Sequence, residues 1–376
     1  MKWLSDKNLK HLLTVANDPD FSATKYRIVE EISRGGMGTV YRVEDTELDR
    51  QIAVKVLNIA SADPDLAQRM IREAQIIARL EHPGIVPVHD VGMLADGRVY
   101  YAMKLVRGSR LDEYAARHEG LKDRLRKFQA ACEAVAFAHA HGVIHRDLKP
   151  ANIMIGSFGE VLVLDWGVAK IVGPARLAKN DVEADMLPLP GQEEAISRAG
   201  QSTLAASAEI TEWNWPSMQA WRKTVPAEDT AHGTIIGTPL YMSPEQARGE
   251  IAQLDERSDV YSLGAILYFL LTNQLPGTQN GEQASLRRPR ELNKKINKPA
   301  EAVCLQALAP APNDRYFSAG ELAKDVVNLI DDEPVTAYQE NTFERIGRWL
   351  GKNRFLVFLV LAYLLMRIFF ILTARN

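Results

Sequence analysis

The stretch His145–Asn152 reads HRDLKPAN. Its carboxylate, Asp147, can accept or orient the proton of an attacking hydroxyl group. Two residues later, Lys149 can offset the charge that develops on a moving phosphoryl group. A carboxylate close to an asparagine can also serve only to cap a loop. The order of these residue types nevertheless predicts part of a phosphoryl-transfer site in this loop.

A second acidic motif, Asp165-Trp166-Gly167, follows an apolar strand that we predict at Val161–Leu164. Together with Asn152, Asp165 supplies the hard oxygen atoms that Mg²⁺ prefers as ligands. Each motif stands in the loop or strand context that this chemistry needs. The two motifs together therefore predict a site for a magnesium-bound nucleotide.

Upstream, Ile32–Tyr41 reads ISRGGMGTVY, with three glycines between two strand-like runs. A backbone without Cβ atoms can approach phosphates and offer them its N–H groups, although such a hairpin is often only a turn. Lys55 follows in a strand, and Glu73 lies in a helix predicted at Asp65–Leu80. If that helix packs on the sheet, Glu73 can pair with Lys55 and aim its ammonium group at phosphates.

Composition sets broad limits. The chain has 376 residues, of which 46% are hydrophobic and 25% are charged, which is typical of a globular protein. A net charge of −3 predicts no nucleic-acid partner. The only cysteines, Cys132 and Cys304, lie in apolar, helix-like runs, so we expect reduced core thiols rather than a disulfide.

The pattern along the chain changes near residue 106. Before it, strand-like runs at Gly38–Val43, Gln51–Leu57 and Arg98–Val106 surround one helix. After it, long helices are predicted at Arg124–His141 and Ser258–Leu271. The aperiodic segment 173–231 predicts an insert, either a regulatory flap or a disordered spacer. Residues 1–25 form a short leader whose function the sequence does not reveal.

These motifs resemble those of the eukaryotic-like (Hanks-type) Ser/Thr protein kinases, and most closely the bacterial membrane-anchored branch. The resemblance covers about residues 26–332, and the motifs that carry it are SRGGMG, AVK with Glu73, EHPGIVPVHD, HRDLKPAN, DWG, GTPLYMSPEQ and SDVYSLG. It implies an α+β, bilobal protein kinase fold, with a β-rich N-lobe at 26–106 and an α-rich C-lobe at 107–332. It also implies ATP with Mg²⁺ as cofactors, with Mn²⁺ as an alternative, and protein substrates.

The resemblance also implies roles for individual residues. The catalytic set is Lys55, Glu73, Asp147, Lys149, Asn152 and Asp165, of which Asn152 and Asp165 would bind the metal. The residues around the nucleotide would be Ile32, Ser33, Arg34, Gly35, Gly36, Met37, Gly38, Val40, Ala53, Lys55, Met103, Lys104, Val106 and Met154. Among these, Met103 would guard the back of the pocket, and the backbone of 104–106 would form the hinge that binds adenine.

Regulation by phosphorylation is a further implication. Arg146 beside the catalytic Asp147 predicts that a phosphate on the activation segment can bind there. Thr230 and Thr234 are the candidate phosphorylation sites by position, although a loop threonine can serve solubility alone. Thr238 is expected to contact Asp147 and Lys149 and to help select Ser/Thr substrates.

Three scaffold residues follow from the same resemblance. Glu245 is expected to pair with Arg315, and Asp259 is expected to brace the catalytic loop from its helix.

The sequence departs from the family pattern in three places. Ser33 replaces the first glycine of the phosphate loop, and Trp166 replaces the usual phenylalanine after the metal-binding Asp165. The segment 272–299 is short and polar where relatives have a further helix that helps to dock substrates. We therefore keep a non-catalytic, kinase-like membrane scaffold as the alternative function. A small-molecule phosphotransferase is a third option, which would not need Thr238.

The C-terminal part predicts a membrane anchor. Phe355–Leu372 reads FLVFLVLAYLLMRIFFIL, about 27 Å as a helix, close to the thickness of a bilayer core. The preceding segment, 333–354, is a basic juxtamembrane linker, and basic flanks stay on the cytoplasmic side. We predict a single-pass membrane protein with a cytoplasmic kinase domain. A buried or interface-lying helix is the alternative, and self-phosphorylation in trans would be compatible with a homodimer.

Overall fold

The computed structural model describes residues 19–35, 38–58, 64–118, 120–166, 170–171, 240–250, 254–276, 278–279, 282–283 and 286–373. Several predicted features lie outside these ranges: most of the leader, Gly36, Met37, Gly167, the 173–231 insert with Thr230, and also Thr234 and Thr238.

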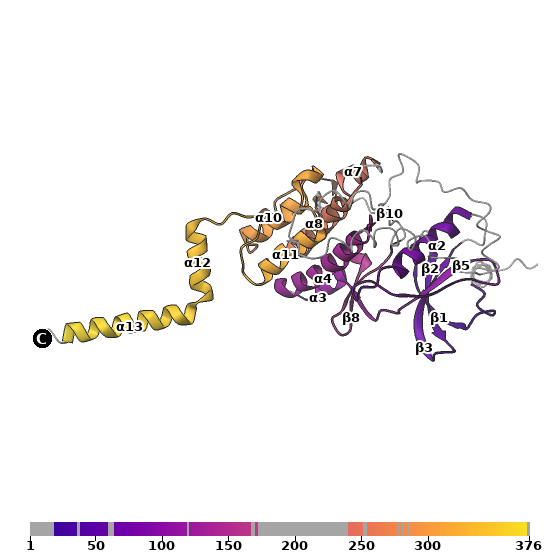
Figure 1. Ribbon diagram of the computed structural model, residues 1–376, viewed down its shortest axis with the longest axis horizontal. Helices are drawn as coiled ribbons and strands as arrows, with labels where there is room; N and C mark the ends of the chain where they lie inside the picture. The colour runs from indigo at the N-terminus through magenta and orange to yellow at the C-terminus, as the bar shows by residue number, and fades with distance from the viewer. Residues whose placement is uncertain are drawn as a thin grey trace, which may run out of the picture. The chain divides into compact units, whose positions relative to one another are not determined.

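The N-lobe is a five-stranded antiparallel sheet with helix α2 against it (Figure 1). The strand order is β1-β2-β3-β5-β4, and the bounds are β1 Tyr26–Arg34, β2 Gly38–Asp45, β3 Arg50–Leu57, β4 Val88–Met93 and β5 Val99–Met103. Helix α2 spans Pro64–Ala78 and buries Ala67, Met70, Ala74 and Ile77. That spacing of three and four residues places them on one face, as packing on a sheet requires.

Aromatic side chains fill the core on the other face of the sheet. Phe21 is 6% exposed, and its ring lies 6.5 Å from that of Tyr41 and 6.1 Å from that of Tyr100. Tyr26 meets Tyr100 edge-on at 5.8 Å. The packed lobe therefore begins upstream of Tyr26, at Phe21 or earlier.

The C-lobe is mainly helical (Figure 1). Its helices are α3 Leu111–Arg117, α4 Leu121–Ala140, α7 Pro244–Ala247, α8 Glu256–Thr272, α9 Pro289–Leu292, α10 Lys298–Ala307 and α11 Ala319–Ile330, with 3-10 turns at Pro150–Asn152 and Pro312–Asp314. Helix α8 is buried on nearly every side, which its run of apolar residues predicts. Gly264 lets α10 approach, because a Cβ there would lie 2.8 Å from the Cβ of Ala307.

Short strands frame the catalytic loop. Strands β6 Gly108–Arg110, β8 Ile153–Gly156 and β9 Val161–Val163 form one sheet in the order β6-β8-β9. Strand β7 Val143–Ile144 pairs with β10 Lys170–Ile171, and β11 Thr278–Gln279 pairs with β12 Glu282–Gln283. The HRDLKPAN loop thus runs from β7 to β8, and Asp165 follows β9 closely.

The C-terminal part contains α12 Thr342–Lys352 and α13 Arg354–Thr373 (Figure 1). Upstream of α12, Val335 is 6% exposed and belongs to the C-lobe core. Within the residues that the structure describes, no single helix meets the length and hydropathy of a membrane span. The length and hydropathy of a span are met only by two of the described helical segments taken together, Thr342–Lys352 and Val357–Arg367. The axes of these two segments form a bend of 86°.

The predicted secondary structure agrees with the observed elements to within a few residues. Helices predicted at Asp65–Leu80, Arg124–His141 and Ser258–Leu271 correspond to α2, α4 and α8. Both cysteines are buried and free, which confirms the prediction of core thiols. The α+β bilobal fold is likewise confirmed.

Candidate active site

The catalytic loop brings its three predicted polar residues together. The ammonium group of Lys149 lies 2.7 Å from the carboxylate of Asp147. Asn152 donates from Nδ2 to the backbone oxygen of Asp147 at 2.8 Å. That hydrogen bond orients the side chain of Asn152 and commits its nitrogen, so its carbonyl oxygen is the atom suited to bind a metal.

Two buried side chains hold the backbone of this loop. Asp259 on α8 accepts hydrogen bonds from the backbone N–H groups of His145 at 2.7 Å and Arg146 at 2.8 Å. Gln246 on α7 donates to the backbone oxygen of Arg146 at 2.8 Å. Arg146 has a φ of +68°, which costs energy in a residue with a Cβ. The predicted brace from Asp259 is confirmed, and Gln246 adds a second brace.

The guanidinium group of Arg146 is buried. Within the part of the chain that the structure describes, its Nε and Nη2 atoms have no hydrogen-bond partner. Burial lowers its pKa, and Asp259 nearby counteracts that effect. Unpaired buried donors are unfavourable unless something binds them. This arrangement is compatible with a site for an added phosphate group.

Lys55 on β3 joins the two lobes. Its Nζ lies 2.9 Å and 3.1 Å from the carboxylate oxygens of Glu73 on α2, and 3.1 Å from Oδ1 of Asp165 after β9. The Lys55–Glu73 pair that the sequence predicts is therefore confirmed. Because Lys55 bonds both carboxylates, it holds α2, through Glu73, and Asp165 in place relative to each other.

Tyr101 completes this network, and sequence reasoning missed it. It lies directly opposite Lys55 on β5, and neighbouring residues in that register share one face of the sheet. Its hydroxyl donates to Oε1 of Glu73 at 2.7 Å, and the whole side chain is 2% exposed. The only sequence signal was a pair of tyrosines, Tyr100 and Tyr101, in an otherwise apolar strand, where a buried hydroxyl needs a partner.

The charges in the network follow from these contacts. Burial alone would lower the pKa of Lys55, but Tyr101, Glu73 and Asp165 outweigh it and raise that pKa well above the usual value. Burial would raise the pKa of Asp165, but Lys55 outweighs it and lowers that pKa. Near neutral pH, Lys55 is therefore a cation and Asp165 an anion, as phosphate and metal binding require.

Trp166 is accommodated where the family usually has phenylalanine. It is 1% exposed and shares a buried cluster with Ile76 and Ile77 of α2. Its ring lies 4.6 Å from that of His145, whose Nε2 is 3.0 Å from the backbone oxygen of Leu164. The larger ring thus packs between α2 and the catalytic loop.

The glycine-rich turn is held by a residue that the sequence analysis overlooked. Asn58, just after β3, donates to the backbone oxygen of Gly35 at 2.7 Å and accepts from the hydroxyl of Thr39. Gly38 has a steric role, because a Cβ there would lie 2.6 Å from the backbone oxygen of Val56. Ser33 pairs with Val40 across the β1–β2 hairpin, so this substitution leaves the hairpin intact.

The residues predicted around adenine lie on strands of both lobes: Ile32 on β1, Val40 on β2, Ala53 on β3, Met103 on β5 and Met154 on β8. Ala53 on β3 is opposite Met103 on β5, and Met154 lies on β8 opposite Arg110. Ile32 is 47% exposed, as a residue that covers a bound base would be in the free protein. Unlike these apolar residues, Arg34 is ion-paired, with Glu31 at 2.7 Å.

One hinge group is already committed. The backbone N–H of Lys104 donates to the backbone oxygen of Pro87 at 3.1 Å. Adenine would therefore use the carbonyl oxygen of Lys104 and the backbone of Val106.

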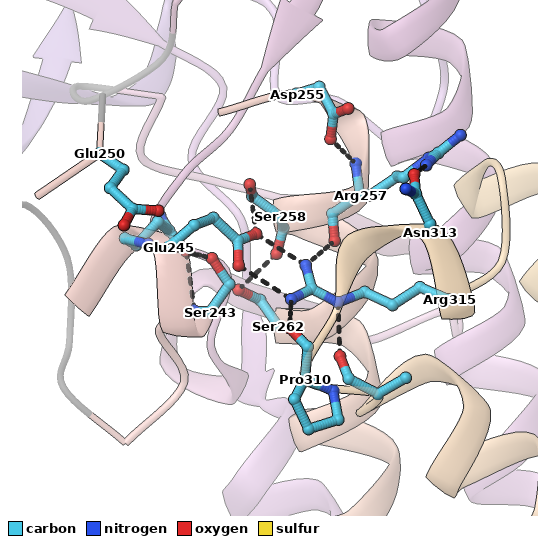
Figure 2. Close-up of polar contacts among 12 residues, drawn as sticks. Ser243, Glu245, Glu250, Asp255, Arg257, Ser258, Ser262, Pro310, Asn313 and Arg315 are labelled. Carbon is cyan, nitrogen blue, oxygen red and sulfur yellow. Dashed lines mark hydrogen bonds and ion pairs between the residues drawn. The ribbon is translucent and has the colours of Figure 1, made fainter. Parts of the chain in front are cut away.

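A buried ion pair stabilises the segment that follows the insert. Arg315 donates to both carboxylate oxygens of Glu245, at 2.7 Å and 2.8 Å, and to the backbone oxygens of Arg257, Ala309 and Pro310 (Figure 2). Ser258 donates to Glu245 as well. Burial alone would raise the pKa of Glu245, but the hydrogen bonds from Arg315 lower it to about 2. The predicted Glu245–Arg315 pair is confirmed.

These residues fit the implied nucleotide and metal. Lys55 presents a charged donor beside Asp165, and the Asp165 side chain is 49% exposed, so a ligand can reach it. Asn152 and Asp165 are the oxygen donors for Mg²⁺, and the turn at Gly35 is shaped by Asn58. When bound, the metal would neutralise charge on the phosphates.

Comparison with known proteins supports this interpretation. Residues 26–184 match the family described as "Protein kinase domain". The chain is 34% identical over 323 residues to the Ser/Thr-protein kinase PknD of Chlamydia muridarum, covering 80% of this chain and 31% of that protein. It is 33% identical over 333 residues to PknB of Mycobacterium tuberculosis, covering 85% of this chain and 45% of that protein.

The chain thus spans less than half the length of these two curated relatives. Among solved structures, the PknI kinase domain of Mycobacterium tuberculosis has a TM-score of 0.52 and 23% identity, covering 81% of this chain and 96% of that one. This likeness concerns the fold. From its motifs, its fold and its relatives, the chain belongs to the eukaryotic-like (Hanks-type) Ser/Thr protein kinases.

Proposed function

We propose that the chain transfers the γ-phosphoryl group of ATP to Ser and Thr hydroxyls of proteins. The observation that carries this proposal is the position of Lys55, which bonds Glu73 and Asp165 simultaneously. This contact aligns a phosphate-binding cation with a metal-binding carboxylate, the requirement for in-line phosphoryl transfer.

The catalytic loop would then act on the acceptor. Asp147 is the group that orients the substrate hydroxyl and takes its proton. Lys149, 2.7 Å from Asp147, is placed to offset charge on the transferred phosphoryl group. Asn152 holds Asp147 through its backbone oxygen and offers its own oxygen to the metal. The magnesium ion supplies electrostatic stabilisation of the phosphates when it is bound.

Regulation and location belong to the same proposal. A phosphate on Thr230 or Thr234, added by the kinase itself, would bind the unpaired guanidinium group of Arg146. The apolar stretch at 355–372 would tether the kinase domain to the cytoplasmic side of a membrane, because basic residues precede it.

The test is transfer of labelled phosphate from ATP·Mg²⁺ by the full chain in detergent, alone and with a generic basic protein. We expect label on Ser or Thr that is lost in Asp147→Asn and Lys55→Met. The matched controls are Asp331→Asn at the end of α11 and Lys324→Met within it, which make the same chemical changes at exposed positions away from the site. ATP binding without any transfer would instead favour the non-catalytic scaffold.

A further inference from the structure

Helix α12 uses its charged side to contact the kinase domain. Glu344 accepts from Lys298 at 2.7 Å, and four residues later Arg348 pairs with Glu340 at 2.8 Å and Glu333 at 3.4 Å. Lys352, four residues further on, also pairs with Glu333. Residues four apart lie on one side of a helix. This side therefore faces the base of the C-lobe, which is the surface formed by the start of α10 and the residues just after α11.

The apolar side of the same helix is exposed. Phe343 is 85% exposed, Ile346 is 51%, Trp349 is 54% and Leu350 is 41%. Their spacing places them on the side opposite the ion pairs. An amphipathic helix in a water-soluble domain normally packs its apolar side on the core. In α12 this arrangement is reversed: the charged side faces the protein and the apolar side faces outward. A contiguous exposed apolar surface of this kind marks a site of contact with another protein or with a membrane.

The adjoining helix indicates what covers this surface. Helix α13 follows α12 with a bend of 86° between Thr342–Lys352 and Val357–Arg367, and the side chains from Phe358 to Arg367 are all exposed, on every side of the helix. Because the exposed side chains surround α13, that helix is fully covered by lipid when it enters the bilayer, and a bend near a right angle then lets α12 lie along the same surface.

The charge and residue types of α12 agree with a lipid surface. Arg348 and Lys352 are paired with Glu333 and Glu340, whereas Arg345 is an exposed basic residue of α12. Basic residues at this level are attracted to anionic headgroups, and tryptophan is favoured at the membrane interface.

We propose that α12 lies in the headgroup region of an anionic bilayer, with Phe343, Ile346, Trp349 and Leu350 toward the acyl chains. The ion pairs on its opposite side then hold the base of the C-lobe at a fixed orientation to the membrane. This role differs from that of the proposed anchor α13, so the two can fail separately.

The test places single nitroxide labels on the full chain in nanodiscs of phosphatidylcholine with phosphatidylglycerol. Both native cysteines are buried, so an introduced cysteine is labelled selectively. Ile346→Cys and Leu350→Cys report the apolar side of α12, and Leu361→Cys reports α13. Phe158→Cys is the aqueous control, because that side chain is apolar but 98% exposed on the kinase domain. The measurement is relaxation of each label by oxygen and by a water-soluble nickel complex.

We expect oxygen to dominate at 346 and 350, and nickel to dominate at 158. Nickel accessibility at 346 equal to that at 158 places the apolar side in water and overturns the inference. Low accessibility to both reagents means that protein covers the side, for example a second copy, and also overturns it. If oxygen dominates at 361 but nickel dominates at 346, the inference about α12 is rejected and the anchor α13 is retained. If oxygen dominates at 346 but nickel dominates at 361, the inference about α12 is retained and the anchor is rejected.

The ion pairs need a separate measurement. We expect the distance distribution between labels at 158 and 346, measured by pulsed dipolar spectroscopy, to be narrow in the otherwise wild-type chain. It should broaden when Glu333→Gln and Glu340→Gln are combined. Glu250→Gln, which alters an ion pair away from α12, should leave it unchanged. An equally narrow distribution in the double variant would overturn the orienting role of the ion pairs.

Discussion

The ammonium group of Lys55 lies 3.1 Å from the carboxylate of Asp165, although 110 residues separate them in the sequence. The same ammonium group bonds Glu73 at 2.9 Å. These contacts join β3, α2 and the segment after β9, so the position of α2 and the geometry for metal binding are linked.

Tyr101 is expected to position Glu73 within this network. Tyr101→Phe removes only the hydroxyl that donates to Glu73, a buried hydrogen bond to a charged group. Such bonds contribute about 1.5–3 kcal/mol, so kcat/KM should fall about 10- to 150-fold. Steady-state kinetics with varied ATP checks this. Tyr100→Phe, on the opposite face of β5, is the control, and equal activity of the two variants would contradict the role.

Asn58 is expected to shape the phosphate-binding turn. Asn58→Ala removes the hydrogen bonds to Gly35 and Thr39, so KM for ATP should rise several-fold, about 1 kcal/mol in binding, with kcat nearly unchanged. Asn58→Asp keeps the oxygen that accepts from Thr39 but loses the donor to Gly35. It separates the two contacts, and unchanged KM in both variants would exclude a role for Asn58.

Arg146 is expected to matter only after phosphorylation. Arg146→Gln removes a buried cation whose Nε and Nη2 have no partners, so the free energy of unfolding should not fall in dephosphorylated protein. In self-phosphorylated protein its activity should drop about tenfold, the effect of losing one charge-assisted hydrogen bond. Assays before and after phosphatase treatment check this. Arg248→Gln, on the surface, is the control. An equal activity loss in both states would show that Arg146 acts independently of the phosphate.

The Glu245–Arg315 pair is expected to make stability depend on acidity. The pKa of Glu245 in the folded protein is about 2, below its ordinary value of 4.5. A lowered pKa means that the ionised form stabilises the fold, fully above about pH 5 and progressively less as the pH falls toward 2. At neutral pH, Glu245→Gln should lose about 3–5 kcal/mol, because Arg315 stays buried without its counter-charge.

Denaturant unfolding between pH 2 and 7 measures this contribution. The variant should have a shallower loss of stability below pH 5 than the wild type. Glu250→Gln, in the exposed pair with Arg248, should follow the wild-type curve (Figure 2). Parallel curves for Glu245→Gln and the wild type would contradict the assignment.

The sequence by itself determined the kinase fold and the identity of the central polar residues. Lys55, Asp147, Asn152 and Asp165 were readable because their chemistry depends on residue type and on order along the chain. Helices α2, α4 and α8 were readable because their apolar residues repeat with helical periodicity.

Only the tertiary structure decided which polar groups meet. Tyr101, Asn58 and Gln246 act through hydrogen bonds between elements distant in sequence, and no local pattern marks such pairs. The same holds for α12. Its amphipathic pattern is local, but the reversal of its two sides depends on where Glu333, Glu340 and Lys298 lie. Periodicity reveals that a helix has two faces, whereas three-dimensional packing determines which face meets the protein.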